Sequence, residues 1–164
     1  MARIEPERLG RLFDEHAAAL GLYARSWCEA PEDVVQEAFV KLAGERNEPE
    51  RPEAWLYRVV RNQAISASRS FWRRRKRERS VSLTETWFTK TDDRIDAQEA
   101  VQLLSELDPE TRAVIVARIW GGLTFDEVAK SQGCSIATVH RRYQAGLQRL
   151  QERIEPSWIA PKTI

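Results

Sequence analysis

Residues 121–143 of the chain read GGLTFDEVAKSQGCSIATVHRRY, and this stretch carries the clearest structural signal in the sequence. Thr124 and Glu127 have the spacing of a capping box at the start of a short helix. Gly133 then interrupts that helix, and Ser135 is suited to cap a second, longer one. A short helix, a glycine turn and a longer helix are typical of a helix-turn-helix, whose second helix enters the DNA major groove. An ordinary helical hairpin is the alternative interpretation.

The longer helix of this stretch has one apolar side and one polar side. Val139 is the apolar anchor that a recognition helix needs, and Ala129 is the small residue expected where the two helices cross. On the free side we expect side chains able to reach base edges or phosphates, at Ser135, Ala137, Thr138, His140, Arg141, Arg142 and Gln144. No nucleophile or carboxylate partner is evident near His140, so we interpret it as a DNA contact rather than a catalyst.

Outside this stretch, strand signals are almost absent and apolar residues recur at helical spacing, which predicts an all-α protein. Pro31 is a favoured first-turn residue and begins a predicted helix that ends at Gly44. A loop follows, and a further helix is predicted to begin at Pro52. Asp108 and Pro109 form a cap and a first-turn proline for another helix.

Residues 51–79 form a basic block with ten Lys/Arg and two acidic residues, whereas the whole chain has a net charge of +1. Trp55, Tyr57, Phe71 and Trp72 are interleaved with the arginines, so the block is able to pair with phosphates and to stack on unpaired bases. A solvated basic helix face is the alternative. The predicted helix has an apolar stripe on one side, and on its polar side it carries Arg58, Arg61, Asn62, Arg69, Trp72 and Arg73.

Helical periodicity is lost over residues 78–94, which are rich in Ser, Thr and Asp and are interpreted as a flexible linker. The sequence therefore predicts two small helical domains, 1–77 and 95–155, followed by a tail over 156–164.

Several function classes find no support in the sequence. The chain has no apolar run long enough to span a bilayer, and its first residues lack the apolar stretch of a signal peptide, so a cytoplasmic protein is expected. The two cysteines, Cys28 and Cys134, lie far apart without clustered histidines, so neither a metal site nor a disulfide framework is predicted. No phosphate loop or nucleophile-base pair is evident, and neither an enzyme nor a bound cofactor is expected.

Four segments taken in order resemble bacterial RNA polymerase sigma factors of the extracytoplasmic-function (ECF) type. They are VVQEAFVKL (34–42), AWLYRVVRNQAIS (54–66), ELDPETRAVIV (106–116) and the helix-turn-helix stretch at 121–143. The resemblance extends over residues 9–154. It implies a sigma region 2-like domain followed by a sigma region 4-like domain, in a protein that is not an enzyme. It also implies core RNA polymerase, through its largest-subunit clamp helices and its flap, and promoter DNA as partners, together with an anti-sigma factor.

The resemblance also implies roles for particular residues. The stripe that would dock on the polymerase clamp helices consists of Asp33, Gln36, Glu37 and Val40. The loop at 45–53 with Arg58, Arg61 and Asn62 would receive unstacked bases of the -10 element, and Arg69, Trp72 and Arg73 would hold the neighbouring backbone. The helix beginning at Ser135 would read the -35 element. Where many members carry further basic residues, this chain has Ala145, Gly146 and Leu147, which implies a weaker phosphate grip.

A stand-alone helix-turn-helix regulator that binds duplex operators is the alternative from a different class. The acidic and amide stripe at 33–40 and the basic helix argue against it, because a repressor needs neither a polymerase docking surface nor a surface for single strands.

Overall fold

The computed structural model describes the backbone of residues 2–74 and 97–153, and the side chains in these ranges other than those of 69–74 and 97–100. The described residues form seven α-helices and no strand, so the predicted all-α class is confirmed. The helices are α1 (Pro6–Ala24), α2 (Pro31–Gly44), α3 (Pro52–Arg74), α4 (Ala97–Ser105), α5 (Pro109–Ile119), α6 (Phe125–Gln132) and α7 (Ile136–Arg153).

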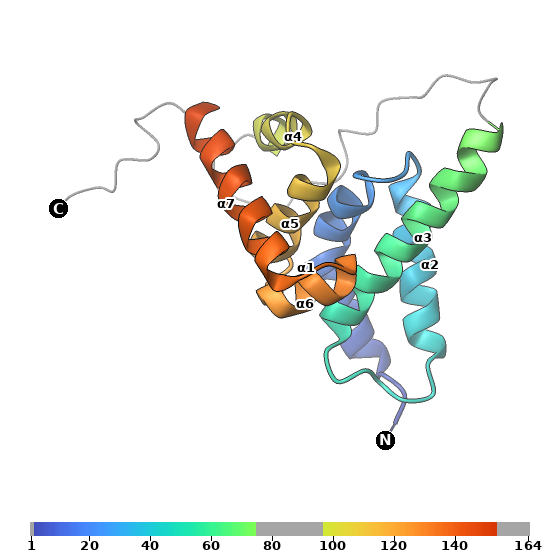
Figure 1. The fold of residues 1–164 in the computed structure, drawn as a ribbon. Coiled ribbons are helices and arrows are strands. Elements are labelled where there is room, and N and C mark those ends of the chain that lie inside the picture. The colour runs from blue at the N-terminus through green and yellow to red at the C-terminus, as the bar shows by residue number, and fades with distance from the viewer. Residues whose placement is uncertain (1, 75–96, 154–164) are drawn as a thin grey trace.

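Helices α1, α2 and α3 pack against one another and form the first half of the molecule (Figure 1). The predicted proline starts of α2 and α3 and the predicted end of α2 at Gly44 are confirmed. The core between the three helices is aliphatic and aromatic, because each helix turns one apolar stripe inward. Its fully buried side chains are Leu20, Tyr23, Val35, Leu42, Leu56, Tyr57 and Val60.

Helices α4 to α7 form the second half, in which α5, α6 and α7 surround a core of Ile115, Leu123, Val128 and Val139. The carboxylate of Asp108 accepts a hydrogen bond from the backbone N–H of Thr111 at 3.1 Å, so the predicted cap of α5 is confirmed. Burial alone would raise the pKa of Asp108, but the hydrogen bonds from Thr111 outweigh it and lower that pKa below its usual value.

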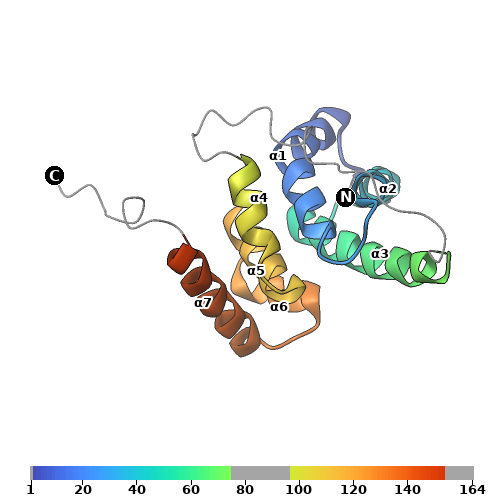
Figure 2. The same ribbon diagram turned by 90° about the horizontal axis from the view of Figure 1, so that it is seen from above.

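The two halves lie side by side and pack directly on each other, α6 against α3 and α5 against α1 (Figures 1 and 2). The linker predicted at 78–94 lies outside the described residues. Direct packing of the two halves was not predicted from the sequence.

Candidate nucleic-acid interface

The acidic and amide stripe of α2 faces away from the protein. Its buried side, made of Val34, Val35, Ala38, Phe39 and Leu42, packs on the neighbouring helices. The opposite side is exposed at all the predicted docking positions, Asp33, Gln36, Glu37 and Val40. Val40 is 71% exposed and is the apolar member of this stripe. The stripe therefore combines an apolar contact point with negative charge and hydrogen-bonding groups.

The polar side of α3 is only partly open. Arg58 and Asn62 are exposed, as predicted. Arg61 is half-buried, and its guanidinium carbon lies 5.3 Å from the centroid of the Trp27 ring. The Arg61 Nε is buried with no hydrogen-bond partner in the protein. Arg61 is thus less accessible than the sequence predicted, because a tryptophan from the segment after α1 partly covers it. The side chains of Arg69, Trp72 and Arg73 lie outside the described part.

The prediction that Tyr57 is available to stack on bases is wrong for this arrangement. Tyr57 is fully buried, and its ring packs edge-on against Tyr23 with centroids 4.8 Å apart. Burial raises the pKa of Tyr57 well above its ordinary value. Of the interleaved aromatic residues, Trp55 is half-buried, and the side chains of Phe71 and Trp72 lie outside the described residues.

The helix-turn-helix is built by the capping signals that the sequence predicted. Thr124 accepts a hydrogen bond from the backbone of Glu127, whose side chain in turn accepts one from the backbone of Thr124, so the capping box is confirmed. Gly133 has φ 64°, a left-handed conformation that favours glycine. Ser135 Oγ accepts from the backbone N–H of Thr138 at 3.2 Å and caps α7. These local contacts fix α7 relative to α6.

The first turns of α7 present a polar surface to solvent. Its exposed predicted residues are Ser135, Ala137, His140, Arg141 and Gln144, and Thr138 beside them is half-buried. The His140 ring stacks on Phe125 at 4.0 Å between centroids, with an interplanar angle of 29°. Phe125 therefore fixes the orientation of His140 on the exposed side of the recognition helix.

Arg142 does not belong to this exposed set, which corrects the sequence prediction. Its Nη1 donates a hydrogen bond to Gln132 Oε1 at 3.3 Å and lies 3.7 Å from Glu110 Oε2. Arg142 thus connects α7 to α6 and α5. Gly146 is also turned inward, because an added Cβ would lie 2.8 Å from a Thr111 methyl carbon and 3.0 Å from Ile115. The absence of a basic side chain at Gly146 is therefore explained by helix packing on α5.

Contacts between the two halves involve Tyr23, Arg51 and Tyr57 of the first half. Tyr23, from α1, places its hydroxyl 3.5 Å from Ser131 Oγ in α6, and desolvation raises the pKa of Tyr23 to about 12. Tyr57 lies against Gly121, where an added Cβ would be 2.7 Å from the tyrosine ring and hydroxyl. Arg51 Nε pairs with Glu127 Oε1 at 2.9 Å. The helix-turn-helix half therefore covers part of the surface beside α3.

Comparison with known proteins connects these two surfaces to one family. Residues 12–78 match the family described as Sigma-70 region 2, and residues 97–150 match Sigma-70, region 4. SigL of Mycobacterium tuberculosis, an ECF RNA polymerase sigma factor, is 32% identical over 163 residues, covering 92% of this chain and 90% of SigL. This chain belongs to the ECF sigma factors of RNA polymerase. The RNA polymerase sigma-E factor of Streptomyces coelicolor is 30% identical over 129 residues, which cover 75% of this sigma factor and 71% of its relative.

Solved structures show the same fold. The sigma factor RpoE of Bartonella quintana, in complex with the anti-sigma factor NepR, superposes on the sigma factor with a TM-score of 0.65 at 24% identity. That match covers 87% of this chain and 93% of the other. CnrH, in complex with the cytosolic domain of CnrY, gives a TM-score of 0.58 at 25% identity, covering 90% and 88%.

Family membership settles the choice between the two function classes. The sigma factor carries a region 2 match as well as the helix-turn-helix, so the stand-alone operator-binding regulator is not favoured. Sigma factors as a family are not enzymes. In the described ranges, no group of His, Cys, Asp or Glu has the arrangement of a metal site, and no helix is long and apolar enough to cross a membrane.

Proposed function

We propose that this sigma factor binds core RNA polymerase through the exposed stripe of α2 and directs it to promoters that it reads with α3 and α7. The main support for the proposal is that this family member exposes two chemically different surfaces, one suited to a protein partner and one suited to DNA. The α2 stripe is acidic, amide and apolar, which suits a protein partner. The α7 surface carries Arg141, His140 and Gln144, which suit DNA. The polymerase clamp helices and flap are the proposed contacts, and no catalytic step is assigned to the sigma factor itself.

Recognition of the -10 element is assigned to α3 and the loop at 45–53. Arg58 and Asn62 are exposed on α3 and are the first contacts proposed for unstacked bases, with Arg61 joining them when its covering by Trp27 is relieved. Holding a base outside the stack requires a few kcal/mol, which stacking and charge-assisted contacts supply. Arg69, Trp72 and Arg73 extend the proposed surface along the DNA backbone.

Recognition of the -35 element is assigned to Ser135, Ala137, Thr138, His140, Arg141 and Gln144. Arg142 is left out of this set, because its side chain already pairs within the domain. It is assigned instead to positioning α7 against α5.

Reading both elements at once requires the two halves to separate. The -10 and -35 promoter elements lie about 10 and 35 base pairs upstream of the transcription start. They are therefore about 25 base pairs apart, or roughly 85 Å at 3.4 Å per base pair. A compact chain of this length has a radius of gyration of only about 15 Å. We call the arrangement in the structure, with α6 packed on α3, the closed arrangement. A molecule in this arrangement is too short to reach both elements. We therefore assign it to a state other than the promoter complex.

An anti-sigma factor is the proposed partner of this closed state, by analogy with the complexes of RpoE with NepR and of CnrH with CnrY. Because core RNA polymerase is the proposed partner, we also propose that the sigma factor acts in the cytoplasm. We keep the domain limits of 1–77 and 95–155, the linker at 78–94 and the tail at 156–164 as part of this proposal.

In vitro transcription with purified core polymerase on a panel of genomic promoters tests the function. We expect promoter-specific transcripts with the wild type and a reduction of about tenfold or more with the Gln36→Ala/Glu37→Ala variant, because docking is lost. Asp14→Ala, which removes one exposed acid from α1, is the matched control and should transcribe normally. Full activity of the double variant would refute docking through α2. Operator binding without core and without transcripts would refute the function itself.

A second arm separates DNA reading from polymerase binding. Arg141→Ala should weaken binding to duplex containing the upstream element by about tenfold while polymerase binding stays intact. Equal loss of both would contradict the assignment of α7 to DNA.

A further inference from the structure

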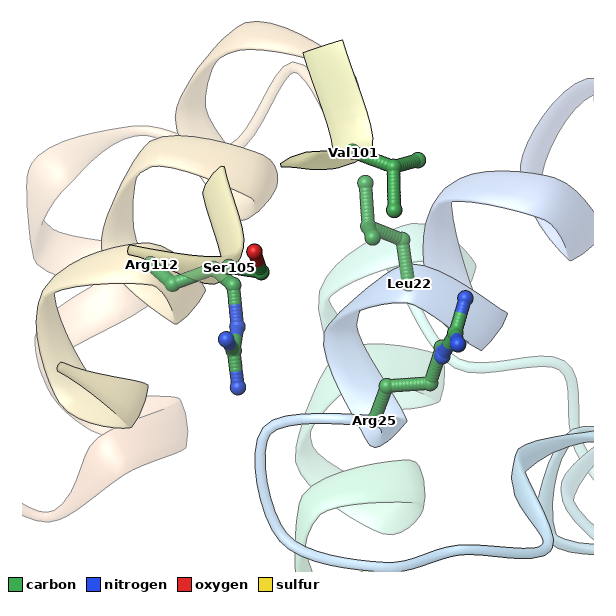
Figure 3. A pocket seen from close by; sticks show the side chains of 5 residues that line it. All are labelled: Leu22, Arg25, Val101, Ser105 and Arg112. Carbon is green, nitrogen blue, oxygen red and sulfur yellow. The ribbon is translucent and has the colours of Figure 1, made fainter. Parts of the chain in front are cut away.

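A cavity of about 220 Å³ lies between the two halves of the sigma factor. Leu22 of α1 and Arg25, the residue directly after that helix, form one wall, and Val101 and Ser105 of α4 with Arg112 of α5 form the other (Figure 3). The two arginine side chains flank the gap from opposite sides. The cavity therefore combines a small apolar surface, from Leu22 and Val101, with two positive charges from different halves of the molecule.

Arg25 and Arg112 lie close enough for the positive charge of one to act on the other. Arg112 Nε donates a hydrogen bond to Ser26 Oγ at 3.2 Å, which orients the guanidinium but does not neutralise it. Burial and, next, the charge of Arg25 lower the pKa of Arg112, and the attraction of Asp108 offsets this only in part. Two like charges are thus held near each other at a partly desolvated place, an arrangement that an anion would relieve.

The form of the cavity favours one class of anion. A planar carboxylate presents both oxygens in one direction and matches a single guanidinium, whereas a phosphate has oxygens on all sides and is suited to arginines that approach from opposite walls. A phosphate group also carries about −1.5 to −2 charges near pH 7, close to the charge of two arginines. The cavity is smaller than the ~300–1,000 Å³ of sites for larger ligands, so the rest of the ligand must be small. Ser105 already donates its proton to the carbonyl of Gln102, so the arginines are the donors.

We propose that this cavity binds the phosphate group of a small phosphorylated molecule between Arg25 and Arg112, and that binding holds the two halves together. Because one arginine belongs to each half, the ligand contacts both only in the closed arrangement and shifts the equilibrium toward it. The binding site stands independently of the promoter function, and its test does not require polymerase.

Isothermal titration calorimetry of the full chain with inorganic phosphate and with ribose 5-phosphate tests the site, at constant ionic strength maintained with sodium chloride. We expect both probes to bind the wild type. Arg25→Gln and Arg112→Gln should each weaken binding about tenfold or more, the factor expected from loss of a charge-assisted hydrogen bond. Arg11→Gln, which removes an exposed positive charge from α1, the helix that Arg25 follows, should bind like the wild type.

Two results would overturn the proposal. If phosphate binds the wild type and all three variants equally, its binding does not involve Arg25 or Arg112. If acetate binds as well as phosphate, the proposed ligand class is wrong. Circular dichroism of each variant shows whether it folds, and Arg25→Gln keeps the test valid if Arg112→Gln does not, because the hydrogen bond to Ser26 belongs to Arg112 alone.

Discussion

Replacement of Ser131 by leucine is expected to separate the two halves of the sigma factor. Ser131 lies on α6 with only 4% of its surface exposed, and its Oγ is 3.5 Å from the hydroxyl of the fully buried Tyr23. Leucine would force extra carbon atoms into this filled space, which costs about 1–3 kcal/mol by overpacking. Since the new atoms point at the first half, most of this energy should oppose the closed arrangement. The ratio of separated to closed molecules should rise roughly 5- to 150-fold.

Fluorescence energy transfer between the two halves measures this change. Dyes are attached at Arg11→Cys on α1 and Arg149→Cys on α7, both exposed positions, with Cys28→Ser and Cys134→Ser removing the native thiols. We expect lower transfer efficiency in Ser131→Leu. The matched control is Lys130→Leu, which places the same residue at a neighbouring side chain that is 76% exposed, and transfer should be unchanged. Unchanged transfer in Ser131→Leu, with early unfolding of the helix-turn-helix, would show that the strain falls within the second half.

Two further substitutions and one chemical modification test individual side chains. Tyr57→Phe should stabilise the protein by about 1 kcal/mol in urea denaturation, because the Tyr57 hydroxyl is buried without a hydrogen-bond partner in the protein; destabilisation would show that the hydroxyl is satisfied. Asp108→Ala should lower stability by about 0.5–2 kcal/mol at pH 7. The pKa of Asp108 is lower in the folded protein than in the unfolded chain. The stability difference between the wild type and Asp108→Ala is therefore fully present above the unfolded-state pKa of about 3.9, and it should vanish as the pH falls through the folded-state pKa. A stability difference that does not change with pH would show that the charge of Asp108 is not what stabilises the helix start. Burial raises the pKa of Cys28 from 9.0 to about 11, so its alkylation by iodoacetamide at pH 8 should be about a hundredfold slower than that of an exposed thiol, and equal rates would contradict the burial.

The helix boundaries were predictable because the signals that set them act within a few residues. Pro31, Pro52 and the Asp108 cap begin helices where the sequence placed them, and Gly133 ends one. Each depends on the geometry of one turn, through a fixed proline φ, a side-chain cap or a left-handed glycine. The exposed stripe of α2 was predictable for a related reason, because helical periodicity separates the inward face from the outward one.

Contacts between distant segments were not predictable from the same signals. Tyr57 follows Leu56 on the edge of the apolar stripe of α3, and it packs against Tyr23 of α1 and Gly121 of the other half. Arg142 likewise lies between the exposed and buried sides of α7, and its inward orientation depends on Glu110 and Gln132. The periodicity of apolar residues predicts which side of a helix is buried, but it does not predict which distant segment packs against the edges of that side.

The polar atoms left unpaired near the domain contact bear on how the sigma factor responds to heat. Trp27 Nε1, Tyr57 Oη, Arg61 Nε and Gln132 Nε2 are all buried without a hydrogen-bond partner in the protein. Of these atoms, Tyr57 Oη lies against Gly121 of the other half and would regain water once the halves part. This gain lowers the free energy of separating the halves relative to that of unfolding either core. On slow warming, the halves should therefore come apart before their helices unfold, and the calorimetric trace should depart from a single cooperative peak.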